Sequence, residues 1–169
     1  VDEILNHSAG PTGYHRDSEW AAKVASHYRV NLERMVSLAR EAGADILFVS
    51  PAVNLRDCAP FKSGHGDGVS VDSIQQLQAL MDDLKDGDSE DLTDREIDQW
   101  NEVLSLDPEF AEAHFRFASD LFASGMYSEA ERAFRTAVDQ DVCPLRATSV
   151  IRSTLEDVAA RTNVPLVDF

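Results

Sequence analysis

The chain has 169 residues and a mass of 18.7 kDa, which is the size of one domain or of one domain carrying a small added module. Fifteen Lys and Arg residues against 31 Asp and Glu give a formal charge of −16, a field that disfavours free nucleic acid and anionic membranes as partners. No apolar stretch approaches the ~18 residues of a bilayer span, so we expect no membrane contact by this segment. Cys58 and Cys143 form neither a CxxC pair nor a disulfide framework, which leaves the compartment open.

The first predicted element is an amphipathic helix that begins near Ser18. Either Asp17 or Ser18 can cap it, and Gly43 is expected to end it. Its apolar residues recur at spacings of three and four: Val24, Tyr28, Leu32, Met35, Val36 and Ala39. The unbroken apolar run at residues 46–49 then predicts a strand that is buried on both faces.

The same order of elements returns at the end of the chain. Residues 148–161 are predicted to form a helix, and residues 164–167 a second strand. Two helix-to-strand units indicate a parallel sheet of the α/β class. Two strands are few for such a sheet, and the chain begins at Val1 rather than Met, so we expect a processed chain or a piece of a longer protein.

The middle of the chain is predicted to be an all-α insert at residues 71–145, between α/β segments at 1–70 and 146–169. Its apolar and small residues occupy positions typical of a tetratricopeptide repeat: Ala111, His114, Phe117, Ala118, Leu121, Gly125, Tyr127, Ala130, Phe134 and Ala137. Residues 96–108 are similar to the second helix and closing Pro of a preceding repeat, whose first helix is expected at residues 74–84. About two repeats are too few to be stable alone, which favours packing of this insert on the α/β part.

Catalytic and metal-binding patterns are weak. The triplet Gly87-Asp88-Ser89 has the letters of a serine-esterase nucleophile, but its acidic neighbours and its place between predicted helices indicate an acidic turn. The five histidines lack metal-ligand spacing and are expected to be surface or packing residues. The segment Gly64 to Gly68 lacks the Walker spacing and its Lys. We therefore predict no catalytic residue, no metal site and no cofactor within this chain.

The loop that leaves the first predicted strand is the best candidate for a binding site. Ligands of parallel α/β sheets bind beyond the carboxyl ends of the strands. Asn54 can donate or accept hydrogen bonds, Arg56 can hold a carboxylate or a carbonyl oxygen, and Asp57 can orient a donor. We predict that Asn54, Arg56 and Asp57 bind substrate; the alternative is an ordered turn in which Asp57 pairs with Arg56.

Several blocks of the chain together resemble a bacterial SGNH-type (GDSL-like) hydrolase that carries a tetratricopeptide-like insert. The resemblance lies in the order of the blocks Tyr28 with Asn31-Leu32, Phe48-Val49-Ser50, Asn54 to Asp57, Pro60-Phe61, Asp107 to Arg116, and Val164 to Asp168. It implies a partial three-layer α/β/α fold and hydrolysis of acyl esters by a longer parent protein. The blocks for the nucleophile Ser and the oxyanion Asn would precede Val1, and the block for the catalytic His would follow Phe169.

Two functions follow as hypotheses. In the first, the chain is an internal segment of an ester hydrolase, inactive alone, whose parent acts on an acyl-ester substrate. In the second, it is a tetratricopeptide-like module that binds a protein or peptide partner without catalysis.

Overall fold

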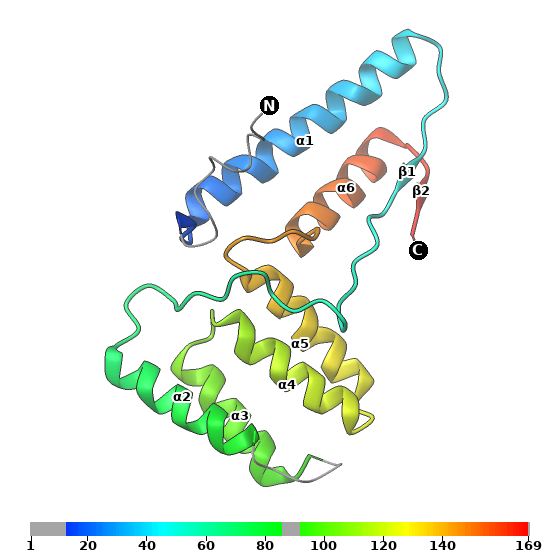
Figure 1. Cartoon of the computed structure of the whole chain (residues 1–169). Coiled ribbons are helices and arrows are strands. Elements are labelled where there is room, and N and C mark those ends of the chain that lie inside the picture. Colours follow the sequence, from blue (N-terminus) through cyan, green and yellow to red (C-terminus); the bar gives the residue numbers. More distant parts are fainter. Residues whose placement is uncertain (1–12, 86–91, 169) are drawn as a thin grey trace, which may run out of the picture. The chain divides into compact units, whose positions relative to one another are not determined.

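The computed structural model describes residues 13–85 and 92–168 (Figure 1). Within these ranges lie six helices and two strands: α1 (Ser18–Glu41), β1 (Phe48–Val49), α2 (Val71–Lys85), α3 (Asp94–Leu106), α4 (Ala111–Ala123), α5 (Tyr127–Gln140), α6 (Ser149–Thr162) and β2 (Leu166–Val167). They divide into two units. The strand unit comprises residues 17–53 and 146–168, with α1, β1, α6 and β2, and the hairpin unit comprises residues 13–16 and 54–145, with α2 to α5.

The two helices of the strand unit begin and end where their sequence signals predict. The Asp17 side chain accepts a 2.7 Å hydrogen bond from the backbone N–H of Trp20, and Gly43 follows α1 with a φ of 70°. Thr148 precedes α6, and Asn163 ends it in the left-handed conformation, at a φ of 52°. The core of the unit lies between these helices and the strands, and it consists of Leu32, Val36, Phe48, Leu155, Val158, Ala159 and Val164.

The strands are shorter and more exposed than the sequence predicts. β1 and β2 pair in parallel, with Phe48 opposite Leu166 and Val49 opposite Val167. Phe48 is buried, whereas Val49 is 48% exposed. The prediction of a strand buried on both faces is therefore wrong, because alternate side chains face the helices while the others face away from them.

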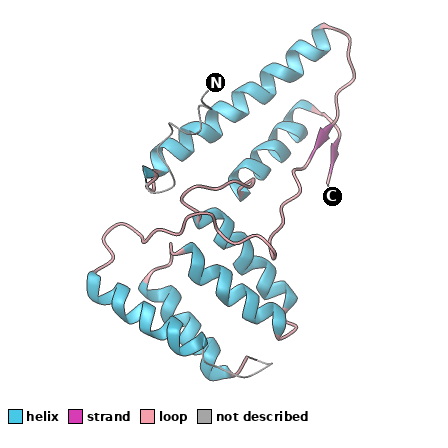
Figure 2. Cartoon of the chain, viewed as in Figure 1, coloured by secondary structure: helices cyan, strands magenta, loops and turns pink. Residues whose placement is uncertain are grey.

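The predicted fold class, a partial three-layer α/β/α sheet of the SGNH type, is also wrong. Helices hold 62% of the described residues, and the sheet has two strands of two residues each (Figure 2). The physical reason lies in the short apolar runs. Each run supplies a single covered face. The bonds that flank β1 run from Phe48 N to Pro165 O and from Ser50 N to Val167 O. Pro165 has no N–H to donate, so it cannot add a ladder bond of its own.

The hairpin unit consists of two helical pairs, α2 with α3 and α4 with α5. The first pair encloses Leu77, Met81, Trp100 and Val103 together with Phe110 and Ala113, and the second encloses Ala118, Leu121, Ala130 and Phe134. The indole N–H of Trp100 donates a 2.8 Å hydrogen bond to Asp120, which ties α3 to α4. Gly125, at a φ of 76°, makes the turn between α4 and α5. This arrangement of helical hairpins is compatible with tetratricopeptide-like repeats.

Corresponding residues of the two pairs are separated by the tetratricopeptide period of about 34 residues. Trp100 of α3 corresponds to Phe134 of α5, and both are buried. The aspartates that follow these helices, Asp107 and Asp141, correspond in the same way, and both are buried as well. A repeated buried carboxylate needs hydrogen-bond donors, and most of these come from the segment between β1 and α2, the others from Glu109 N and Cys143 N.

Candidate functional site

The candidate site is a surface of the hairpin unit that holds a segment of the same chain without regular secondary structure. We call residues 54–66 the strap; none of them belongs to a helix or a strand. Figure 1 shows the trace between β1 and α2 running along α4 and α5 before it reaches α2. The part of the hairpin unit that contacts the strap is here called the strap-binding face, and it includes Asp107, Phe110, Phe122, Asp141, Val142 and the apolar cluster of α4 and α5.

Asp141 holds the middle of the strap by its backbone. Its carboxylate accepts hydrogen bonds from Phe61 N at 2.6 Å and from Lys62 N at 3.0 Å. In return, Val142 N donates a 2.9 Å bond to Lys62 O. A third N–H, from Cys143, also donates to Asp141. The Asp141 carboxylate is therefore satisfied by backbone N–H groups, which a segment can offer when it turns two successive N–H groups to the same side.

Asp107 holds the end of the strap in a similar way. Its fully buried carboxylate accepts bonds from Gly66 N at 3.3 Å, from Glu109 N at 3.1 Å and from the His65 ring, whose Nδ1 lies 2.8 Å from Oδ2. The His65 ring also stacks on Phe110, with centroids 4.5 Å apart and planes within 11°. Because a carboxylate accepts this bond, His65 donates it from Nδ1–H.

Two strap glycines lie too close to the hairpin unit for a larger residue. A Cβ on Gly64 would lie 2.9 Å from Val142 Cγ2. A Cβ on Gly66 would lie 2.6 Å from Glu109 Oε2 and 3.2 Å from Asp107 Oδ1. The glycines therefore allow the strap backbone to approach the carboxylates within hydrogen-bond distance.

Arg16 and Lys62 connect the strap to the residues before α1. One guanidinium nitrogen of Arg16 donates to Glu109 O at 2.8 Å, to Gln140 O at 3.1 Å and, more weakly, to Gly64 O at 3.5 Å. Lys62 Nζ donates to Tyr14 O. Arg16 thus satisfies a carbonyl at the C-terminal end of α5, where a cation is favoured.

The predicted site residues Asn54, Arg56 and Asp57 form one turn at the start of the strap. Asn54 Oδ1 accepts a 2.9 Å bond from Asp57 N, and Arg56 pairs with the Asp57 carboxylate at 2.9 Å and 3.4 Å. The Arg56 guanidinium also lies 5.0 Å from the centre of the Phe122 ring. Their pairing has the geometry of the ordered turn; substrate binding by these residues stays a prediction.

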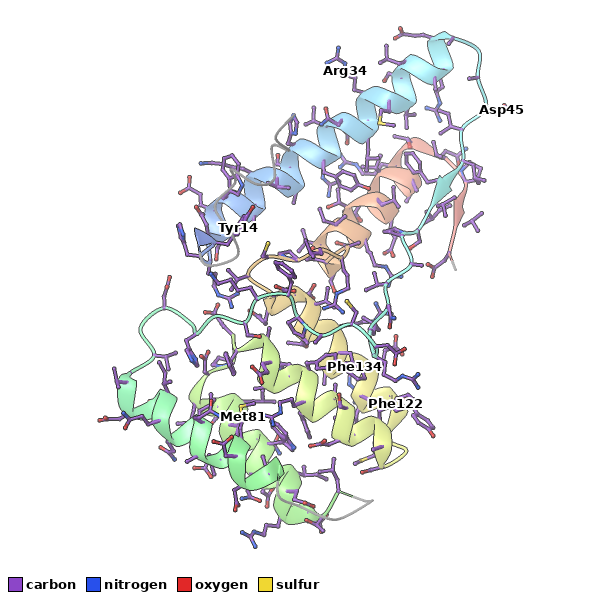
Figure 3. The ribbon with its side chains drawn as sticks, in the orientation of Figure 1. Tyr14, Arg34, Asp45, Met81, Phe122 and Phe134 are labelled. Atoms are coloured by element: carbon purple, nitrogen blue, oxygen red, sulfur yellow. The ribbon has the colours of Figure 1, made fainter. Side chains whose placement is uncertain are left out.

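Leu55, inside this turn, fixes the strap to the hairpin. It packs against the cluster of Ala118, Leu121, Ala130 and Phe134. Figure 3 labels Phe122 on α4 and Phe134 on α5, the aromatic residues at this end of the face. Leu55 and Arg56 thus contact α4 and α5 through apolar and cation–π contacts, whereas the rest of the strap is held through carboxylates.

The remaining sequence candidates take no part in this site. Gly87-Asp88-Ser89 lies outside the described residues. His114 Nε2 donates a 2.8 Å bond to Pro108 O, and burial lowers the pKa of His114. No cluster of three His, Cys, Asp or Glu side chains suited to a metal ion occurs among the residues that the structure describes. Across residues 13–85 and 92–168, no helix has both the length and the apolarity of a bilayer span.

Sequence reasoning missed the residues that matter most in this arrangement, namely Asp107, Asp141, His65 and Phe110. One signal was present: the two aspartates lie one repeat apart, each directly after a helix that carries a repeat pattern. A second was the pair of glycines, Gly64 and Gly66, on either side of His65, since glycine permits close approach of one backbone to another group.

The chain matches no protein-family model, and neither the curated proteins nor the solved structures contain a match to it.

Proposed function

We propose that the chain is a protein-interaction module whose hairpin unit binds a polypeptide segment through its backbone N–H groups, as it holds the strap. The observation that carries this proposal is the pair of buried carboxylates, Asp107 and Asp141, that accept backbone N–H groups from the strap. Backbone recognition supplies affinity without demanding particular side chains, and the contacts on either side supply selectivity. The finer assignment, to tetratricopeptide-like repeats, is part of the same proposal and is supported by the periodic placement of Trp100 and Phe134.

The charge of the chain favours a basic partner. A formal charge of −16 attracts cationic polypeptides and raises their rate of encounter at low ionic strength. At the site itself, the one cationic side chain of the strap that lies on an aromatic ring is Arg56. We therefore propose a partner segment of net positive charge.

A selection from a library of displayed peptides tests this function with the full chain as bait. A chain with both Asp107→Asn and Asp141→Asn serves as the counter-bait, because each amide keeps one acceptor oxygen but loses the charge. We expect basic peptides that bind the native chain and lose at least about tenfold in affinity on the double variant. Peptides that bind both chains equally would contradict the proposal.

A second candidate, an internal segment of an ester hydrolase, is favoured by one specific observation. Blocks that carry the resemblance to SGNH hydrolases lie on both sides of the contact between strap and hairpin: Arg56 and Phe61 in the strap contact Phe122 and Asp141, and Asp107 in the hairpin unit contacts His65. This proposal concerns the activity of a longer polypeptide. It expects no turnover of p-nitrophenyl esters by the chain alone; turnover that Ser89→Ala abolishes would contradict it.

A further inference from the structure

We infer that the strap is an internal ligand of the strap-binding face, and that the external partner is a basic peptide that takes its place. This inference rests on the proposed function and adds the regulation of the site and the chemical pattern of its partner. In the structure the face is occupied from end to end by residues of the same chain, from Leu55 to Gly66.

The pattern of the partner follows from what each part of the face contacts. At the α4 end it accepts an aliphatic side chain followed by a cation, as Leu55 and Arg56 provide. At Asp141 it requires two successive backbone N–H groups, so a proline at either of these positions is excluded. At Asp107 the face binds a planar ring that carries an N–H donor. His65 provides such a ring: it donates to Asp107 and stacks on Phe110.

The glycines add a size limit to this pattern. Gly64 and Gly66 lie within 2.9 Å and 2.6 Å of side-chain atoms of the hairpin unit, measured from the position of an added Cβ. A partner must therefore carry its smallest residues beside the nitrogen donor. An ordinary basic peptide without small residues at these positions is expected to bind weakly.

The strap has the properties of a segment that can be displaced. It makes no strand ladder with the hairpin unit, and the Arg56–Asp57 pair at its start is solvent-exposed. Segments with few buried apolar contacts open at low free-energy cost. The apolar contacts that release breaks are those of Leu55 with the apolar cluster, of the His65 ring with Phe110 and of Gly64 with Val142.

Tethering explains why a free peptide cannot compete easily with the strap. A segment joined to its own binding site by a short linker has an effective concentration on the order of mM. With an intrinsic Kd of about 10 μM for the strap, the occupied form outweighs the open form roughly 100-fold, and the apparent affinity for a free peptide is lowered by the same factor. Loosening the strap should raise the apparent affinity for an external peptide by about that factor.

The experiment uses a release variant, Lys62→Pro with Gly66→Val, in the full chain. The first substitution removes an N–H that Asp141 accepts, and the second places a side chain against Asp107 and Glu109. Both changes lie in the strap, so the strap-binding face is unaltered. Asp67→Ala, at an exposed residue just after the strap, is the matched control.

The probe is a fluorescein-labelled synthetic peptide of residues 54–66, with Ser in place of Cys58, followed by fluorescence anisotropy. A second peptide, N-methylated at Phe61 and Lys62, lacks the N–H groups that Asp141 accepts. All variants are made in a Trp20→Phe background, so that the emission of Trp100, buried in the hairpin unit, reports whether that unit is folded. If the release variant is not folded, Gly66→Val alone replaces it.

We expect the release variant to bind the probe about 100-fold more tightly than the native chain and the Asp67→Ala control, and to reject the methylated peptide. Equal affinity of native chain and release variant would overturn self-occupancy, while the proposed function would still be judged by the display selection. A folded release variant that binds neither peptide would overturn the strap as a ligand. Failure of the selection as well would overturn the proposed function itself.

Discussion

At the scale of single residues, the hairpin unit is organised by two buried carboxylates that accept several hydrogen bonds each. Asp107 and Asp141 are 0% and 5% exposed, and each accepts at least three hydrogen bonds. A buried carboxylate without donors would be strongly unfavourable, so each of these residues requires the strap or an equivalent segment to lie where it does. Two other side chains, Asp120 and His114, have shifted pKa values that affect stability in opposite directions as the pH changes.

Asp120 is expected to favour folding at acidic pH. Burial raises the pKa of its carboxyl above the ordinary 3.8, an effect that the Trp100 indole N–H and Arg116 partly offset. A raised pKa means that the folded state binds the proton more readily, so its contribution to stability is lost as the pH rises through that pKa. Asp120→Asn keeps an acceptor for Trp100 but does not titrate. The free energy of unfolding of this variant, relative to that of the native chain, should therefore rise between about pH 4 and about pH 7. Urea unfolding at both pH values measures this, and a constant difference would contradict it.

His114 is expected to act in the opposite direction. Burial lowers its pKa below 6.5, and the bond to Pro108 and the charge of Asp107 offset this in part. A lowered pKa means that stability is present above about pH 6.5 and is lost as the pH falls through the lowered pKa. His114→Gln keeps an N–H donor but does not titrate, so the native chain should lose more stability than the variant between about pH 7.5 and about pH 5. Thermal unfolding of both chains at the two pH values is the measurement; equal losses would rule the effect out.

At the scale of elements, substitutions in β1 test whether the sheet is covered on one face only. Phe48 lies in the core of the strand unit, whereas its neighbour Val49 is 48% exposed. Phe48→Ala should lower the free energy of unfolding by about 3 kcal/mol. Val49→Thr should change it by less than about 0.5 kcal/mol. A large cost for Val49→Thr in denaturant unfolding would indicate that the second face is covered after all.

The helices could be predicted from the sequence because their signals are local. Asp17 and Gly43 mark the ends of α1, Asn163 ends α6, and the repeat pattern places α4 and α5 around Gly125. The extent of the sheet is not a local property. An apolar run such as residues 46–49 shows that a segment can be buried, but the number of strands and layers depends on partners that the run does not encode.

The candidate site was predictable only at one end. Asn54, Arg56 and Asp57 were singled out from their place after a strand, and the structure brings them together in one turn. The rest of the strap depends on contacts between residues far apart in sequence, such as His65 with Asp107 and Phe61 with Asp141. No periodicity reveals such contacts in advance, although the repeated aspartate could have drawn attention to them.

At the scale of the whole molecule, the two units have separate cores, and each contains one of the two Trp residues: Trp20 in the strand unit and Trp100 in the hairpin unit. In a Trp20→Phe background, fluorescence reports the hairpin unit alone. Adding Val158→Ala, a fully buried position of the strand unit, should cost that unit about 2 kcal/mol. The fluorescence transition should stay in place while part of the circular-dichroism transition moves to lower denaturant. Transitions that shift together would show that the units unfold as one.

The central claim is that Asp107 and Asp141 recognise the backbone N–H groups of a bound segment, and one measurement tests it most directly. Asp141→Asn is added to the release variant, and the anisotropy of the labelled peptide of residues 54–66 is recorded with both chains. We predict a loss of at least about tenfold in affinity, because Asp141 accepts the N–H groups of both Phe61 and Lys62. The same affinity with and without the Asp141 carboxylate, in a chain whose Trp100 emission shows an intact hairpin unit, would contradict the account.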